Sequence, residues 1–243
     1  MNRMILGALA GLLLSTTAHA ETVSVAVAAN FTGVAEALAP LFKAETGHDV
    51  SYSFGATGQL YTQITQGAPF EVFLAADDVR PARAVSEGFG VEGSVFTYAI
   101  GALALYSTVL ELGDGQAVLE AGAFDKIAIA DPATAPYGQA ATETIAALGL
   151  TEAIAPKLVM GENITQTLQF VESGNAELGF VAASQVAGKT GIWIVPAELF
   201  EPIRQDGVLL KTGESNPAAT AYVDFLRSDT AIAVIEAAGY VVE

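Results

Sequence analysis

The chain of 243 residues contains no cysteine, and it has few basic residues. Without disulfides, its stability must come from the packing of a hydrophobic core. Its 10 lysines and arginines stand against 27 aspartates and glutamates, which gives a formal net charge of −17. Nucleic acids and anionic membranes bind proteins through clustered basic residues. We therefore expect no nucleic-acid partner and no attraction to an anionic membrane surface.

Residues suited to catalysis are also scarce. Only two histidines occur, His19 and His48. His48 follows the end of an expected helix, so we expect it to be a solvent-exposed residue and not a catalytic one. The sequence has no Gly-x-Ser-x-Gly nucleophile elbow and no metal-ligand spacing. Asp77 and Asp78 are adjacent carboxylates, which we interpret as caps of the helix that follows them. We do not expect an enzyme, although a secreted hydrolase stays open as an alternative.

The first twenty residues have the order of a secretory signal peptide. Asn2 and Arg3 make a short basic start, an apolar run covers 5–14, and Ala-His-Ala at 18–20 is a small-x-small cleavage site. The run is too short to span a bilayer, and no later run reaches about eighteen apolar residues. We expect cleavage after Ala20 and a periplasmic protein. Removing 20 of the 243 residues leaves 223, and the loss of Arg3 makes the net charge −18.

Strand-like and helix-like segments alternate along the rest of the chain. The expected strands are 22–28, 50–54, 71–75, 126–130, 157–160, 178–181, 192–195 and 208–211. The expected helices are 32–46, 59–66, 77–87, 139–148, 165–173, 218–227 and 229–238. The apolar segment 95–107 is too long for one ordinary strand and is a candidate crossing between lobes. This alternation predicts βαβ units, an α/β fold with parallel sheets and helices on their faces.

Four of the strand-to-helix turns share a chemical character. They contain Asn30, Gly-Ala-Thr-Gly at 55–58, the Pro-containing segment 131–138, and Gly-Glu-Asn at 161–163. All follow the carboxyl ends of strands, where open α/β sheets bind ligands. None contains lysine, arginine or histidine, and a helix start carries about half a positive charge. Taken singly, each turn is explained by a helix cap, a glycine turn or a stiff loop. Together they predict neutral donors for an oxyanion.

Five stretches of sequence carry a family resemblance. They are "VAVAANF", "SFGATGQLYTQI", "ADPATAPYGQAA", "GENITQTLQFVESGNAELGFVAASQV" and the closing "GVLLK…AYVDFLRS…AGY". In order and spacing they resemble the ModA family, the periplasmic molybdate-binding proteins of molybdate ABC transporters. The likeness runs from about residue 23 to the C-terminus, and "GENITQTLQFVESG" and "ADPATAPYG" are its most specific parts.

The resemblance implies a two-lobed periplasmic binding protein fold. Each lobe is expected to be a mostly parallel sheet flanked by helices, with the ligand in the cleft between the lobes. Lobe 1 is expected to be discontinuous, made of 21–99 and 204–243, and lobe 2 to comprise 100–203. The chain is expected to cross between the lobes near 98–101 and again near 201–205, and these crossings are the expected hinge.

The resemblance also assigns the anion site. The residues that it places at the ligand are Ala29, Asn30, Thr57, Tyr137 and Ile164. Asn30 is expected to donate from the first turn, and Thr57 to donate with its hydroxyl and amide where the family usually has serine. Tyr137, Ile164 and Ala29 are expected to contribute backbone amides. One branch of the family uses a tyrosine hydroxyl where this chain has Ala182, so that contact is expected to be missing.

The expected function is high-affinity binding of molybdate, and of tungstate, followed by delivery to the membrane permease of an ABC transporter. Molybdenum would be bound as the oxyanion, so neither a cofactor nor a direct cation ligand is expected, and we expect a monomer. The alternatives are a binding protein for another tetrahedral oxyanion such as sulfate, and the secreted hydrolase.

Overall fold

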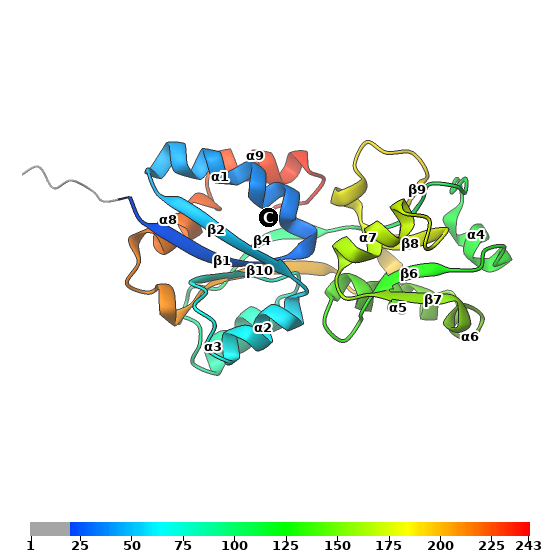
Figure 1. Ribbon diagram of the computed structural model, residues 1–243, viewed down its shortest axis with the longest axis horizontal. Helices are drawn as coiled ribbons and strands as arrows, with labels where there is room; N and C mark the ends of the chain where they lie inside the picture. Colours follow the sequence, from blue (N-terminus) through cyan, green and yellow to red (C-terminus); the bar gives the residue numbers. More distant parts are fainter. Residues whose placement is uncertain (1–19) are drawn as a thin grey trace, which may run out of the picture.

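Two five-stranded sheets form the framework of the computed structural model, which describes residues 20–243 (Figure 1). The predicted signal peptide, residues 1–20, lies outside the described residues except for Ala20. Across this described part, no helix combines the length and the apolar character needed to cross a membrane.

The first sheet has the strand order β2-β1-β3-β10-β4. Its strands are β1 (Thr22–Ala28), β2 (Asp49–Gly55), β3 (Val72–Leu74), β4 (Phe96–Gly101) and β10 (Ile203–Leu209). β1 pairs in parallel with β2 and β3, whereas β10 pairs antiparallel with β3 and β4. The expected parallel arrangement therefore holds for β1 and its two neighbours β2 and β3, whereas the antiparallel pairs of β10 make the sheet a mixed one.

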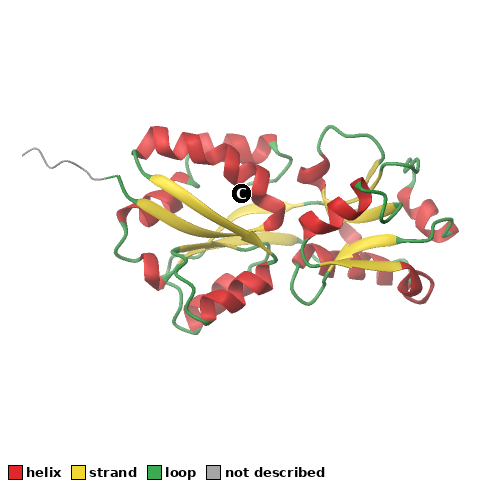
Figure 2. Ribbon diagram, in the orientation of Figure 1, coloured by secondary structure: helices red, strands yellow, loops and turns green. Residues whose placement is uncertain are grey.

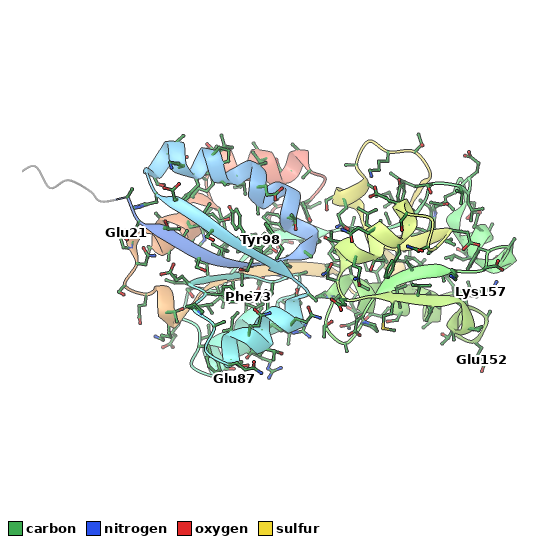
Figure 3. All side chains as sticks on the ribbon, viewed as in Figure 1. Glu21, Phe73, Glu87, Tyr98, Glu152 and Lys157 are labelled. Atoms are coloured by element: carbon green, nitrogen blue, oxygen red, sulfur yellow. The ribbon has the colours of Figure 1, made fainter. Side chains whose placement is uncertain are left out.

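Helices cover both faces of this sheet (Figure 2). On one face lie α1 (Thr32–Thr46), α8 (Pro217–Phe225) and α9 (Asp229–Ala237), and on the other lie α2 (Thr57–Thr65) and α3 (Val79–Ser86). Phe73 and Tyr98 lie inside this lobe (Figure 3). α1 packs on the sheet because its apolar residues recur at helical spacing, so that Val34, Leu38 and Phe42 all face the core. Each such buried side chain contributes about 1.5–3 kcal/mol.

The second sheet has the order β7-β6-β8-β5-β9. Its strands are β5 (Leu103–Ser107), β6 (Ile127–Ala130), β7 (Leu158–Gly161), β8 (Leu178–Ala182) and β9 (Ile192–Ile194). β6 pairs in parallel with β7 and β8, and β5 pairs antiparallel with β8 and β9. The helices packed on it are α4 (Gly115–Ala121), α5 (Pro136–Ala147), α6 (Thr151–Ile154) and α7 (Ile164–Glu172).

The chain passes between the sheets twice. The apolar segment 95–107 forms two strands, because β4 ends at Gly101 in the first sheet and β5 begins at Leu103 in the second. The return runs from β9, which ends at Ile194, to β10, which begins at Ile203. The predicted strand 208–211 is thus displaced, because β10 begins five residues earlier, at Ile203, and ends two residues earlier, at Leu209.

Short 3₁₀ turns complete the architecture. They are η1 (Ala29–Phe31), η2 (Ala155–Lys157), η3 (Ala183–Val186), η4 (Ala197–Leu199) and η5 (Lys211–Gly213). The first matters most for the site, because it joins the carboxyl end of β1 to α1.

Candidate anion-binding site

All five residues that the sequence placed at an anion line one cavity between the two lobes. From the first lobe its walls are Ala28, Ala29, Asn30, Gly55, Ala56, Thr57 and Ala76, and from the second lobe Ala135, Pro136, Tyr137, Asn163 and Ile164. The cavity volume is about 10 Å³, and its lining residues are buried except for Pro136 and Asn163, which are partly exposed. This free space is about enough for one water molecule, so a larger ligand would fit only after the walls move apart.

Helix starts meet at this cavity from both lobes. α2 begins at Thr57 in the first lobe, and α5 and α7 begin at Pro136 and Ile164 in the second. The parallel strands β1, β2, β6 and β7 end beside these turns, which brings segments distant in sequence to one place. Each helix start carries a partial positive charge on its first N–H groups.

Several of these N–H groups have no acceptor within the described part of the chain. They are the backbone amides of Asn30, Thr57, Tyr137 and Ile164. A buried donor without a partner costs about 1–3 kcal/mol. The cavity is therefore built to receive an acceptor-rich ligand.

No charged side chain is among the residues that line the cavity. Arg80, which bonds the loop before α5, forms an ion pair with Asp77 and donates from Nη2 to the carbonyl oxygen of Ala133 at 3.2 Å. Asp131 is engaged within its own loop, accepting from the Ala133 amide at 3.0 Å. The attraction for an anion thus comes from neutral dipoles.

The structure does not support Asn30 as a helix cap. Its Nδ2 group donates to Oε1 of Gln205 at 2.8 Å and to the hydroxyl of Tyr240 at 3.0 Å, and it caps neither η1 nor α1. An asparagine amide has two protons, so both are taken. The donor that Asn30 keeps for the cavity is its backbone N–H.

Thr57 is not a cap either, whereas Asn163 is. The Thr57 hydroxyl oxygen accepts from the amide of Ala76 at 3.0 Å, which leaves its own proton free to donate. Asn163 Oδ1 accepts from the amides of Thr165 and Gln166, both at 3.0 Å. This cap satisfies the second and third amides of α7 and leaves that of Ile164 for the cavity.

Hydrogen bonds between the lobes hold the cavity shut. The amide of Gly58 donates to the carbonyl of Thr134 at 2.8 Å, and the hydroxyl of Thr165 donates to the carbonyl of Ala29 at 3.2 Å. These bonds connect the two lobes on either side of the cavity.

Three polar residues behind the cavity were missed in the sequence: Tyr98, Gln205 and Tyr240. All are nearly fully buried. Burial raises the pKa of each of the two tyrosines, so their hydroxyls stay protonated and able to donate. No spacing rule assigns these residues to the site, since each lies in a different part of the chain, and the closing "AGY" that contains Tyr240 gives no role to its hydroxyl.

Ala182 lies at the end of β8 and is not among the lining residues. A tyrosine hydroxyl from this position is therefore absent, as the sequence indicates.

Comparisons with known proteins place the chain among extracellular solute-binding proteins. The family model for bacterial extracellular solute-binding proteins matches residues 23–241. The molybdate-binding protein ModA of Rhodobacter capsulatus is 53% identical to the chain, covering 95% of it and 92% of that protein. ModA of Azotobacter vinelandii is also 53% identical, covering 99% and 97%. A solved structure of the Azotobacter vinelandii periplasmic molybdate-binding protein superimposes with a TM-score of 0.85 at 38% identity, over 91% of this chain and 99% of that one.

Proposed function

Because this chain belongs to the ModA family of bacterial extracellular solute-binding proteins, we propose that it binds molybdate between its lobes and delivers it to the permease of a membrane ABC transporter. The relatives at 53% identity span nearly its whole length and bear the name of molybdate-binding proteins.

The observation that carries this proposal is the meeting of helix starts from both lobes at one uncharged, closed cavity. A tetrahedral dianion presents acceptors in every direction, so amides and a hydroxyl from opposite walls each find an oxygen. A hydrogen bond to a charged group contributes about 1.5–3 kcal/mol. No carboxylate lines the cavity to repel the anion.

The donors that we assign are the backbone amides of Ala29, Asn30, Tyr137 and Ile164, together with the amide and hydroxyl of Thr57. Tungstate has the same shape and charge as molybdate, so we propose that it binds as well. Molybdenum enters as the oxyanion, without a cofactor.

Closure of the lobes would present a surface made of both to the permease. We propose that the lobes comprise 21–99 with 204–243, and 100–203. The two crossings between the sheets, at Ala102 and between Ile194 and Ile203, support this division. We also propose a monomer, exported to the periplasm by the segment 1–20.

Calorimetric titration of the stripped mature protein with molybdate, tungstate, sulfate and phosphate tests the proposal. We expect molybdate and tungstate to bind with similar affinity and more tightly than sulfate. Sulfate binding more tightly than molybdate would favour the other oxyanion carrier. Turnover in a parallel ester and phosphoester hydrolysis screen, without heat from molybdate, would favour the hydrolase.

A further inference from the structure

A buried polar network lies directly behind the candidate site and connects both of its walls. Gln205, on β10, is its centre: Oε1 accepts from Nδ2 of Asn30 at 2.8 Å and from the hydroxyl of Tyr98 at 3.2 Å. Its Nε2 donates to the hydroxyl of Tyr137 at 3.3 Å. Gln205 is 0% exposed, so all three bonds are shielded from water.

The two ends of this network belong to different lobes. Asn30 lies in η1, at the end of the first-sheet strand β1, and Tyr137 lies in the first turn of α5, which packs on the second sheet. Gln205 lies in β10, the strand by which the chain re-enters the first sheet after crossing from the second. The bond from Gln205 to Tyr137 therefore links the first sheet to the helix start of lobe 2.

The other joining segment is fitted to the same hydroxyl. A Cβ at Gly101, the last residue of β4, would come within 2.1 Å of the Tyr137 hydroxyl and 2.7 Å of Gln205 Nε2. Any larger residue at Gly101 would displace the ring. Both crossings thus touch the phenol of Tyr137, although its proposed ligand contact is the backbone amide on the other side of the residue.

A second set of bonds secures the opposite side of the network. The hydroxyl of Tyr240 accepts from Asn30 Nδ2 and donates to the Asn30 carbonyl, both at 3.0 Å. Ser184, in η3 of the second lobe, donates to the same hydroxyl at 2.9 Å. Asn30 is therefore fixed on both sides by groups whose neighbours lie in the other lobe.

We propose that Gln205 is a positioning residue that couples occupation of the anion cavity to closure of the lobes. It holds Asn30 so that its backbone N–H faces the cavity, and it holds the first turn of α5 through the Tyr137 hydroxyl. When the lobes separate, Nε2 of Gln205 loses this acceptor. The bond therefore stabilises the closed, ligand-retaining state alone. This inference rests on the proposed function.

The Tyr137→Phe variant tests it, because it removes the acceptor of Gln205 and keeps the backbone amide proposed to bind the anion. In this variant Nε2 of Gln205 is left unpaired in the closed state, which destabilises that state by the value of one buried neutral hydrogen bond. We therefore expect molybdate to be released about 10-fold faster. Release is measured by rapid filtration of protein loaded with radiolabelled molybdate after mixing with excess unlabelled molybdate.

Tyr52→Phe is the matched control. Its hydroxyl bonds the hydroxyl of Tyr222 at 3.0 Å within the first lobe, so this variant also loses a hydrogen bond of a tyrosine hydroxyl but no link between lobes. We expect its release rate to stay within 2-fold of wild type. Equal release rates for Tyr137→Phe and Tyr52→Phe would overturn the inference.

A double-mutant cycle with Gln205→Leu isolates the pair. If Gln205 acts on release through Tyr137, adding Tyr137→Phe to Gln205→Leu should change the rate less than 2-fold. If the two substitutions instead multiplied each other's effect on the release rate, the coupling would be refuted. Failure of the proposed function is distinct, since wild-type protein would then retain no radiolabelled molybdate at all.

Discussion

The hydroxyl of Thr57 gives the sharpest test of how the cavity would hold an anion. Thr57→Val is nearly isosteric, so it removes the hydroxyl while keeping the volume and the branched shape at Cβ. The residue is 1% exposed and stands at the first position of α2, where valine is tolerated. The perturbation is thus confined to one donor toward the ligand and one acceptor for the Ala76 amide.

The two losses have separate signatures. Losing a donor to a charged ligand costs about 1.5–3 kcal/mol, which weakens molybdate binding by about 10- to 150-fold. Losing the acceptor of the buried Ala76 amide costs the ligand-free protein about 1–3 kcal/mol of unfolding free energy. A domain stable by about 5–15 kcal/mol stays folded at 25 °C, so affinity is measurable.

Calorimetry gives the dissociation constant, and denaturant unfolding of the ligand-free protein gives the stability. Thr57→Ser keeps the hydroxyl and should bind within about 5-fold of wild type. Thr144→Val is the second control, because Thr144 is fully buried in α5 and bonds only the Ala140 carbonyl, at 2.8 Å, away from the cavity. An unchanged molybdate affinity in Thr57→Val would refute the assignment of this hydroxyl as a donor.

The remaining predictions concern the core, the ligand range, salt and pH. Leu38→Ala should cost about 2–5 kcal/mol of unfolding free energy, measured with denaturant, and leave molybdate affinity unchanged. Monoprotonated phosphate should compete less well than sulfate at pH 7, because no carboxylate lines the cavity to accept its proton; equal competition in calorimetry would contradict this. Molybdate association, measured by stopped flow, should quicken as salt rises, since a net charge near −18 repels the dianion over a screening length of about 8 Å at 0.15 M; rates that fall steeply with salt would count against neutral donors. Burial raises the pKa of Asp206, so its ionisation costs stability at neutral pH, and that cost fades as the pH falls through the raised pKa. Asp206→Asn, which keeps an acceptor for the Thr97 hydroxyl, should therefore raise the melting temperature at pH 7 and raise it less at pH 4.

Local sequence patterns were sufficient for the α/β architecture and for the strand-to-helix turns that line the cavity. The strand-to-helix turns follow short apolar strands, and parallel strands bring their carboxyl ends to one edge of each sheet. The cap role of Asn163 was also readable, because an asparagine before a helix with free second and third amides satisfies both.

The same patterns were misleading where a polar side chain pairs with a distant residue. Asn30 and Thr57 each have the sequence context of a cap, yet each side chain bonds a group of another element. β10 was placed too late, because Arg204, Gln205 and Asp206 interrupt the apolar pattern that predicts a strand. Gln205 and Asp206 lie inside the protein because Asn30, Tyr98 and Thr97 satisfy their polar atoms.

Sequence distance explains why this network escapes prediction. Asn30 is 175 residues from Gln205 and 210 from Tyr240, so no window on the chain contains both partners of either bond. A buried amide is costly unless its partners are already placed, and here the partners come from β10 and from the segment after α9. In the folded protein, the turn at Asn30 is therefore held in shape by two segments that lie near the other end of the chain.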